Sequence, residues 1–165
     1  MTQGNSISRA RKSDSRMVRV RRARAADLPA LANLYDELHL GEYRVARAAP
    51  SQMRRAFEAL TRSRDHHILV AESEGEIVGT LHLLIFRHLG HGLHPAAIAE
   101  NVVVRGDHRS KGIGETMLAE AARIARVNRC YKMALTTNVA RKRAHRFYER
   151  LGWRRTHYGY SLGLD

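Results

Sequence analysis

The sequence predicts a single α+β domain built on a mixed β-sheet, and three observations support this fold class. The chain has 165 residues, of which 44% are hydrophobic and 27% charged, as expected for one globular domain with one core. Short apolar or alternating runs typical of strands are interspersed with segments of helical periodicity. The order of these elements contains no repeat, so we expect no second domain.

Local signals predict one strand and one helix at the start of the domain. Val18 and Val20 alternate with arginines, which indicates a strand. Asp27 precedes leucines at helical spacing and is the expected N-cap of a helix. Pro29 lies in its first turn, where a missing amide hydrogen costs nothing. This helix is expected to end near Gly41.

A second helix and a β-hairpin follow. Ser51 comes directly after Pro50 and precedes apolar residues at helical spacing, which predicts a short helix. Two apolar runs, 67–71 and 77–86, flank the sequence Glu-Gly-Glu at 74–76, which is a hairpin signal. The second half of the chain is expected to contain a strand over 96–104, a helix over 109–127, a strand over 131–137, a helix over 140–151 and one or two strands over 153–164. Gly152 is the expected C-terminal cap of the last helix.

The net charge of +13 is concentrated at the N-terminus. Residues 1–24 contain eight basic residues and one acidic residue, which gives +7 of the total. Residues 1–16 are polar and without period, so we expect a flexible basic tail and a domain over 17–165. A basic protein attracts polyanions, and a nucleic-acid-associated protein is therefore an alternative. Against it, the chain has no helix-turn-helix or zinc signature and no cluster of aromatic residues for base stacking.

Cysteine content and hydropathy predict a cytoplasmic protein. The single cysteine, Cys130, cannot form an internal disulfide or a thiolate zinc site, and a lone thiol fits a reducing compartment. No apolar run approaches the roughly 18 residues that a membrane span needs, so we expect no membrane partner. The first 16 residues lack the apolar segment of a secretory signal.

A glycine-containing turn between the strand over 96–104 and the helix that follows suggests a phosphate site. A helix N-terminus presents amide hydrogens without acceptors and a partial positive charge, and glycines let a diphosphate approach the backbone. Gly112 and Gly114 lie at this point, with Arg109 and Lys111 beside them. The Walker and dinucleotide-binding patterns are both absent. Taken alone, the glycines are equally compatible with a tight strand-to-helix turn.

The run Arg109–Gly114 (RSKGIG) resembles the Arg/Gln-x-x-Gly-x-Gly/Ala loop of the GNAT superfamily of acyl-CoA N-acyltransferases. The segments around it are similar to the rest of that family's pattern: Val102-Val103-Val104 before it, and Thr137-Asn138, Ala144–Tyr148 and Leu151-Gly152-Trp153 after it. The resemblance is strong over about 97–155, and the element order agrees from Met17 onward. It implies a three-layer fold in which four helices flank a mixed, mostly antiparallel sheet of about six to seven strands.

By the same resemblance, acetyl-CoA is the expected co-substrate. The backbone of Val102, Val103 and Val104 would pair with the pantetheine arm, at a strand that a bulge separates from its neighbour in the family. The pyrophosphate would be held by the amides of Arg109, Ser110, Lys111, Gly112, Ile113, Gly114 and Glu115. Asn138 and Tyr148 are further expected cofactor contacts, and Asn138 is also the expected N-cap of the last helix.

Glu100 and Tyr148 are the candidate catalytic residues. Glu100 lies on an otherwise apolar strand and is the candidate base that deprotonates the amine, unless it forms a structural salt bridge. In relatives, a tyrosine at the position of Tyr148 directs its hydroxyl at the CoA sulfur, although an apolar helical stripe alone would also account for this residue. Cys130 is expected to be a small core residue, so we expect direct transfer.

The acceptor is expected to be a primary amine of a small molecule. The downstream motifs look similar to those of aminoalkylphosphonate N-acetyltransferases, and an anionic group could be bound by Arg44, Arg47, Arg87 or Arg141. A protein-lysine or N-terminal acetyltransferase and a CoA-binding protein without turnover remain alternatives. Relatives often dimerise, so a homodimer is also considered. No metal is expected, because the histidines spaced by three at 88, 91 and 94 lie in a glycine-rich loop and match no metal-binding motif.

Overall fold

The computed structural model describes residues 18–38 and 48–163 and confirms an α+β fold. The expected basic tail, residues 1–16, lies outside the described residues, as do Arg44 and Arg47. The elements in chain order are β1 (Arg19–Arg22), α1 (Leu28–Leu38), α2 (Pro50–Arg62), β2 (His66–Ser73), β3 (Glu76–Phe86), β4 (Ala96–Val104), α3 (Ile113–Val127), β5 (Lys132–Ala134) and α4 (Lys142–Arg150).

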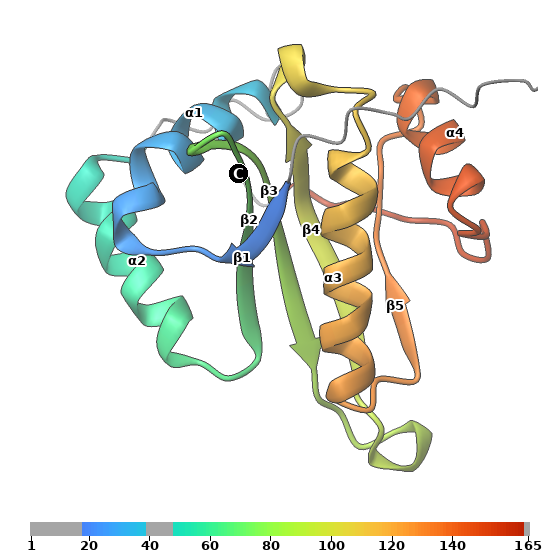
Figure 1. The fold of residues 1–165 in the computed structure, drawn as a ribbon. Helices are drawn as coiled ribbons and strands as arrows, with labels where there is room; N and C mark the ends of the chain where they lie inside the picture. Colours follow the sequence, from blue (N-terminus) through green and yellow to red (C-terminus); the bar gives the residue numbers. More distant parts are fainter. Residues whose placement is uncertain (1–17, 39–47, 164–165) are drawn as a thin grey trace, which may run out of the picture.

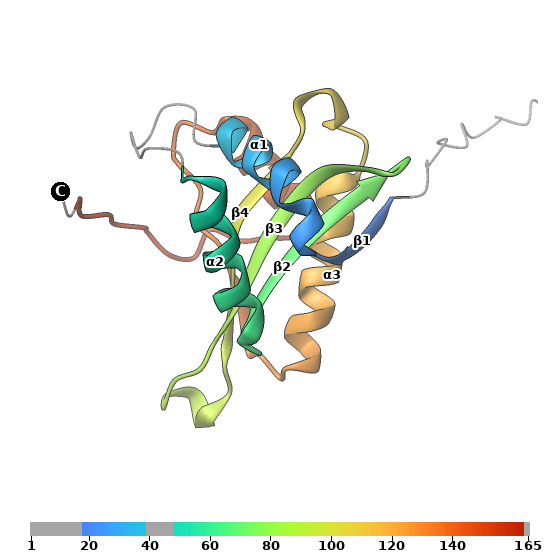
Figure 2. The same ribbon diagram turned by 90° about the vertical axis from the view of Figure 1, so that its left-hand side faces the viewer.

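The molecule has three layers, with the sheet between two layers of helices (Figures 1 and 2). The strand order is β1-β2-β3-β4-β5, with antiparallel pairing except between β4 and β5, which are parallel. One core lies between the sheet and α3, with Leu81, Met117 and Ala121 fully buried at its centre. A smaller core joins α1 and α2 to the other face through Leu31, Phe57 and other apolar side chains.

β4 is bulged in its middle, and this bulge separates it from β5. Thr80 pairs with Val103 and His82 with Glu100, so one residue of β3 faces two residues of β4. One of those two, Asn101, has a φ of 52°, in the left-handed region that asparagine tolerates better than most residues. Pairing between β4 and β5 stops at Ile98. The edge of β4 from residue 99 to 104 is therefore not covered by β5.

Two expectations about the C-terminal part of the sheet are wrong for the described residues. The sheet has five strands instead of six or seven, because residues 153–163 form no strand. Their alternation is present, but Tyr158 and Tyr160 are 92% and 94% exposed, and the segment does not pair with any strand of the sheet. β5 has three residues instead of seven, because β4 diverges from it after Ile98.

Backbone conformation moves the start of α3 from the expected position near Arg109 to Ile113. Ser110 and Gly112 have φ values of 63° and 79°, which no right-handed helix contains. Gly112 is the N-cap, and an L-residue at this φ would be strained. By contrast, Gly152 has the positive φ of 83° expected of a glycine that ends a helix, directly after Leu151 caps α4.

Asp27 stabilises the junction of β1 and α1, although not as the expected N-cap of α1. It lies in a 3-10 turn before this helix and accepts hydrogen bonds from the amide of Arg24, at 2.7 Å, and from the Arg21 guanidinium, at 2.7 and 3.0 Å. Arg21 also binds Glu72 on β2 at 2.8 Å. The Arg21 side chain is 15% exposed and that of Asp27 8%, so the pair is largely removed from water.

We expect Asp27→Asn to lower the free energy of unfolding by about 3 kcal/mol, because breaking a buried ion pair from one side costs about 3–5 kcal/mol and Glu72 still compensates Arg21. The hydrogen bond from Arg21 lowers the pKa of Asp27 below its ordinary value. The stabilisation is therefore complete above the unfolded-state pKa of about 3.9 and is lost as pH falls through the lower folded-state value. Urea unfolding of both proteins between pH 7 and pH 3 tests this, and a difference that does not narrow at acidic pH would contradict it.

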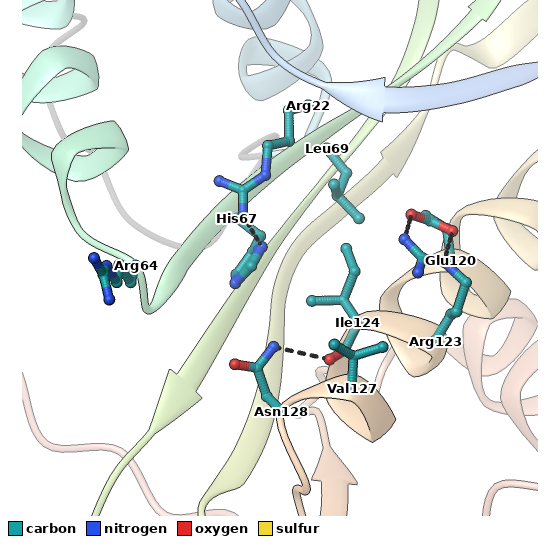
Figure 3. Close-up of a pocket in the computed structure, with 9 residues that line it drawn as sticks. All are labelled: Arg22, Arg64, His67, Leu69, Glu120, Arg123, Ile124, Val127 and Asn128. Atoms are coloured by element: carbon teal, nitrogen blue, oxygen red, sulfur yellow. Dashed lines mark hydrogen bonds and ion pairs between the residues drawn. The ribbon is translucent and has the colours of Figure 1, made fainter.

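A recess of about 420 Å³ lies between the β1–β2 edge of the sheet and the C-terminal half of α3 (Figure 3). We call it the β1–α3 recess. α3 has 15 residues, which corresponds to about 22 Å, and its other end begins at Gly112. The recess is therefore separate from the glycine turn. It is lined by Arg22, Arg64, His67, Leu69, Glu120, Arg123, Ile124, Val127 and Asn128.

Candidate active site

The turn from β4 into α3 presents a row of backbone amides at the helix N-terminus. The Thr116 amide donates to the carbonyl of Gly112, the N-cap residue of α3, at 3.0 Å, so the amides of residues 110–115 precede the regular helical pattern. A Cβ on Gly112 would meet no atom within 4 Å, which leaves open space over the turn. A Cβ on Gly114 would lie 3.0 Å from the Phe147 ring, so this glycine instead allows α4 to pack against α3.

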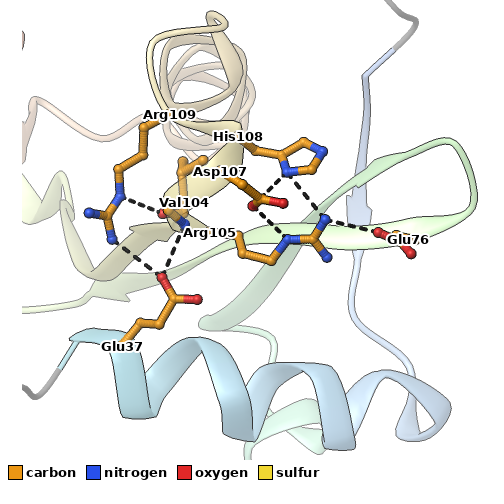
Figure 4. Close-up of polar contacts among 8 residues, drawn as sticks. Glu37, Glu76, Val104, Arg105, Asp107, His108 and Arg109 are labelled. Atoms are coloured by element: carbon orange, nitrogen blue, oxygen red, sulfur yellow. Dashed lines mark hydrogen bonds and ion pairs between the residues drawn. The ribbon is translucent and has the colours of Figure 1, made fainter.

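Glu37 at the end of α1 holds this turn in place (Figure 4). Its carboxylate accepts hydrogen bonds from the amide of Gly106 at 3.1 Å and from Arg109 Nη2 at 3.4 Å. Arg109 also donates from Nε to the carbonyl of Val104 at 2.9 Å. The guanidinium of Arg109 thus connects α1 to the end of β4. A carbonyl oxygen accepts two hydrogen bonds, so Val104 retains one acceptor position for a ligand.

A second polar cluster fixes the start of the same turn (Figure 4). Arg105 donates to Asp107 from Nε and to Glu76 on β3 from Nη2, both at 2.9 Å. The Asp107 carboxylate also lies 2.8 Å from His108 Nδ1. The hydrogen bonds from Arg105 and then from His108 hold the pKa of Asp107 well below its ordinary value. The residues before the glycine turn are therefore tied to β3 as well as to α1.

Glu100 lies on β4 beside the bulge, on the sheet face that α1 and α2 cover. It pairs in register with His82, and His82 pairs on its other side with Ile68, which belongs to the α1–α2 core. Directly opposed residues point to the same face, which places Glu100 there. Its side chain reaches the surface, yet neighbouring atoms remove enough water from the carboxylate to raise its pKa above the ordinary value. No ion pair of Glu100 occurs among the described residues, so the alternative of a structural salt bridge has no support there.

The face around Glu100 also carries two histidines in contact. His66 Nδ1 on β2 lies 2.9 Å from His82 Nε2 on β3. Burial, and then the neighbouring His66 and His67, lower the pKa of His82. An uncharged imidazole is therefore the dominant form of His82 at neutral pH, and Glu100 is the one carboxylate opposite it in the ladder.

Tyr148 on α4 is half-buried between Phe147 and Trp153, with ring centroids 5.2 and 5.9 Å away. Its pKa is raised, chiefly by burial; the charge of Arg141 opposes this and that of Glu100 adds to it. The two candidate catalytic residues thus lie close enough to influence each other electrostatically. Both candidate roles for Tyr148, packing and proton donation, are compatible with this environment.

Asn138 lies at the turn before α4 but does not cap the helix. Its side-chain oxygen accepts from the amide of Ala140 at 2.8 Å, and its carbonyl accepts from the amide of Arg141, which is the N-cap residue. Arg141 Nη2 donates to the carbonyl of Leu38 at 2.8 Å and so joins α4 to the end of α1. Of the other arginines proposed for an anionic group, Arg87 is in an ion pair with Asp65 at 2.9 Å.

The remaining sequence candidates lie away from this region. His91 stacks on Tyr131 and His88 contacts the same ring edge-on. Both histidines belong to the loop between β3 and β4, at the far end of the sheet from the glycine turn (Figure 1). Burial raises the pKa of Cys130, as expected for an inert thiol. Over residues 18–38 and 48–163, no group of three or more His, Cys, Asp or Glu side chains could hold a metal ion. No helix in the same residues is long and apolar enough to cross a membrane.

Two residues of the site were missed by the sequence analysis. Asn101, which forms the bulge with its neighbour, carries a usable signal, because an asparagine inside a mostly apolar strand is a candidate for positive φ. Glu37 carries none, because its partner Gly106 is 69 positions away in the chain. Its role depends on how α1 packs across β4.

A strand with an uncovered edge, a bulge beside a carboxylate, and a helix N-terminus opened by a glycine define an acyl-CoA-binding α+β fold. These features fit acetyl-CoA, since the open space over Gly112 and the amides after it suit a pyrophosphate. Residues 28–153 match the model of the acetyltransferase (GNAT) family, so the chain belongs to this family.

Comparison with individual proteins supports the same assignment. The chain is 36% identical over 98 residues to aminoalkylphosphonate N-acetyltransferase of Salmonella typhimurium, covering 59% of this chain and 63% of the relative. It is 32% identical over 80 residues to glucosamine 6-phosphate N-acetyltransferase of Trypanosoma brucei brucei, covering 48% and 52%. The chain thus matches between half and two thirds of the length of these relatives. A transcriptional regulator from Bacillus halodurans superposes with a TM-score of 0.83 at 29% identity, covering 90% of this chain and 100% of that one.

Proposed function

We propose that this protein is an acetyl-CoA-dependent N-acetyltransferase that transfers the acetyl group directly to a primary amine. The observation that carries the proposal is the edge of β4 over residues 99–104, which β5 leaves uncovered beside the glycine turn. An extended pantetheine arm can add to such an edge as a further strand, through Val102, Val103 and Val104. An arm bound in this way would bring the acetyl group near the bulge and hence near Glu100, which lies beside it on β4.

Glu100 acts in this proposal as the base that prepares the amine. An alkylammonium titrates near 10.4, so at pH 7 about one molecule in a thousand is neutral. The raised pKa of Glu100 makes its carboxylate a stronger base than that of an ordinary glutamate. A proton can pass to it directly or through one water molecule.

Tyr148 acts as the donor to the departing thiolate. We expect Tyr148→Phe to lower kcat by about 10- to 100-fold, at the lower end of general acid catalysis, because a thiol with a pKa near 8.5 leaves without full protonation. The hydroxyl makes no hydrogen bond among the described residues, so the melting temperature should not fall. Steady-state assays and thermal unfolding of both proteins measure this; unchanged kcat would assign Tyr148 to packing alone.

The acceptor in this proposal is a small amine with an anionic group. Both curated relatives are named for acceptors that carry a phosphonate or phosphate. In this chain Arg141 lies near enough to Tyr148 for its charge to lower the pKa of that residue. Arginine suits bidentate binding of a phosphoryl group.

A coupled assay of CoA release tests both the acetyl transfer and the anionic acceptor. Aminoalkylphosphonates and glucosamine 6-phosphate should be acetylated, and neutral glucosamine should be a much weaker acceptor. Transfer to lysine-containing or N-terminal peptides instead would identify a protein acetyltransferase. Acetyl-CoA binding without transfer to any amine would leave a cofactor-binding protein.

A homodimer and a cytoplasmic location stay predictions, which size-exclusion chromatography with light scattering and cell fractionation would check.

A further inference from the structure

We propose that the β1–α3 recess is a second binding site, for a small organic molecule that carries an oxyanion on an apolar body. It lies on the α3 face of the sheet, at the other end of α3 from the glycine turn and on the opposite face from Glu100. The proposal does not depend on the acetyltransferase activity. Figure 3 shows His67 on β2 directed toward the last turn of α3, with Arg22 of β1 above it.

The recess contains a buried ring nitrogen that has no close hydrogen-bond partner in the described part of the chain. His67 is 5% exposed, and its Nε2 has no hydrogen-bond partner among the described residues. Its other ring nitrogen, Nδ1, lies 2.6 Å from Nη2 of Arg22. A guanidinium only donates, so Nδ1 accepts and the proton of the neutral ring is assigned to Nε2. A buried donor without an acceptor destabilises the protein, and a ligand oxygen that accepted from it would remove this penalty.

The ring stays neutral at neutral pH in this environment. Burial and then the charge of Arg22 lower the pKa of His67. These effects outweigh the polar interaction with the Arg64 backbone and the negative charge of Asp65, which raise this pKa. His67 therefore contributes a directed N–H donor to the recess, and the positive charge comes from the arginines.

The charges around the recess favour an anion. Within the described residues Arg22 and Arg64 have no carboxylate partner. Glu120, the one acid in the lining, is held by Arg123 through two hydrogen bonds of 2.7 and 2.8 Å, so these two charges compensate each other. The carbonyl of Ile124 at the end of α3 already accepts hydrogen bonds from the amide and the side chain of Asn128. It therefore does not compete with a ligand for the donors of the recess.

The size and the opposite wall of the recess indicate more than a simple ion. About 420 Å³ is within the range of small-molecule sites and well above the volume of a phosphate. Leu69 of β2 and Ile124 and Val127 of α3 supply the apolar surface. Aryl or alkyl phosphates and carboxylates share the chemistry that this lining would recognise.

Calorimetric titration of the full chain with phenyl phosphate and, in a separate arm, benzoate tests the proposal. At least one should bind, phenol should not, and inorganic phosphate should bind more weakly. Arg64→Gln should weaken binding by about tenfold, as expected for a charge-assisted hydrogen bond, whereas Arg62→Gln, two residues away on α2 and outside the lining, should not. Saturating acetyl-CoA should leave the affinity unchanged.

His67→Phe removes the donor and should abolish binding. Since this variant can fail to fold, the wild-type ring provides an independent measure: ¹⁵N NMR should show an Nε2–H tautomer whose signal shifts on addition of the bound probe. No binding of either probe, equal binding by Arg64→Gln, displacement by acetyl-CoA, or an unmoved His67 signal would each overturn the proposal.

Discussion

Glu100→Gln is expected to lower kcat/KM for a primary amine by about 10²- to 10⁴-fold, the range that general acid–base catalysis supplies. The substitution keeps the size of the side chain and its place beside the bulge, and removes only the ability to take a proton. Acetyl-CoA binding should be unaffected, because the contacts expected for the cofactor come from the backbone of β4 and the glycine turn. Assays with a fixed acceptor, beside direct measurement of acetyl-CoA affinity, separate the two effects.

The pH profile distinguishes a base from a structural carboxylate. Burial raises the pKa of Glu100, so the acid limb of the wild-type kcat/KM profile should lie above the ordinary pKa of a glutamate. That limb should be absent from the variant. The defect should shrink as pH rises toward the pKa of the amine, near 10.4, because the acceptor is then neutral without a base. Glu58→Gln, an exposed position on α2, is the matched control. A profile that Glu100→Gln leaves unaltered would remove Glu100 from the base role.

The parts of the fold that depend on local signals agree with the sequence analysis. β4 has the predicted bounds, Ala96–Val104, since its apolar run is limited by Pro95 on one side and by the polar segment after Val104 on the other. The hairpin at 74–76 is present, with Glu74 and Gly75 both at positive φ, as a tight hairpin turn requires.

The parts of the fold that depend on a partner strand do not agree with the sequence analysis. Alternation over 153–164 predicts strands, yet a strand exists only where it pairs with a neighbour, and the described part of this segment pairs with no strand. β5 itself is short because the bulge at Asn101 turns β4 away. The family resemblance implies a bulge in this strand, but its position becomes visible only in the register of β3 against β4.

The candidate site likewise contains features that local signals predict and contacts that they do not. The glycine turn and its helix could be located from residue types and spacing alone, whereas the contacts that hold the turn could not. The backbone amide of Arg109 was expected to bind the pyrophosphate, with the guanidinium adding positive charge beside it. In the structure the side chain of Arg109 binds Val104 and Glu37, so its contact with a cofactor stays a prediction. Its exposed guanidinium retains nitrogen atoms for such a contact.

Acetyl-CoA at 100 times its Kd should stabilise the wild-type protein by about 2.7 kcal/mol. For a chain of this length that corresponds to a rise in melting temperature of about 5–10 °C. We expect Gly112→Asp to abolish this rise, for two reasons. The positive φ of Gly112 strains any L-residue, and a carboxylate at this position would lie where the pyrophosphate is expected.

Gly75 makes it possible to separate these reasons from a general loss of stability. It has a φ of 81° against 79° for Gly112, and a Cβ at either position meets no atom within 4 Å. Gly75→Asp should therefore lower the melting temperature about as much as Gly112→Asp but retain the full acetyl-CoA shift. Gly112→Asn introduces a side chain of similar size at the same φ without the charge and should retain part of the shift. A full shift in Gly112→Asp would mean that the turn is only a connection between β4 and α3, and no shift in the wild type would bring the nucleic-acid alternative forward.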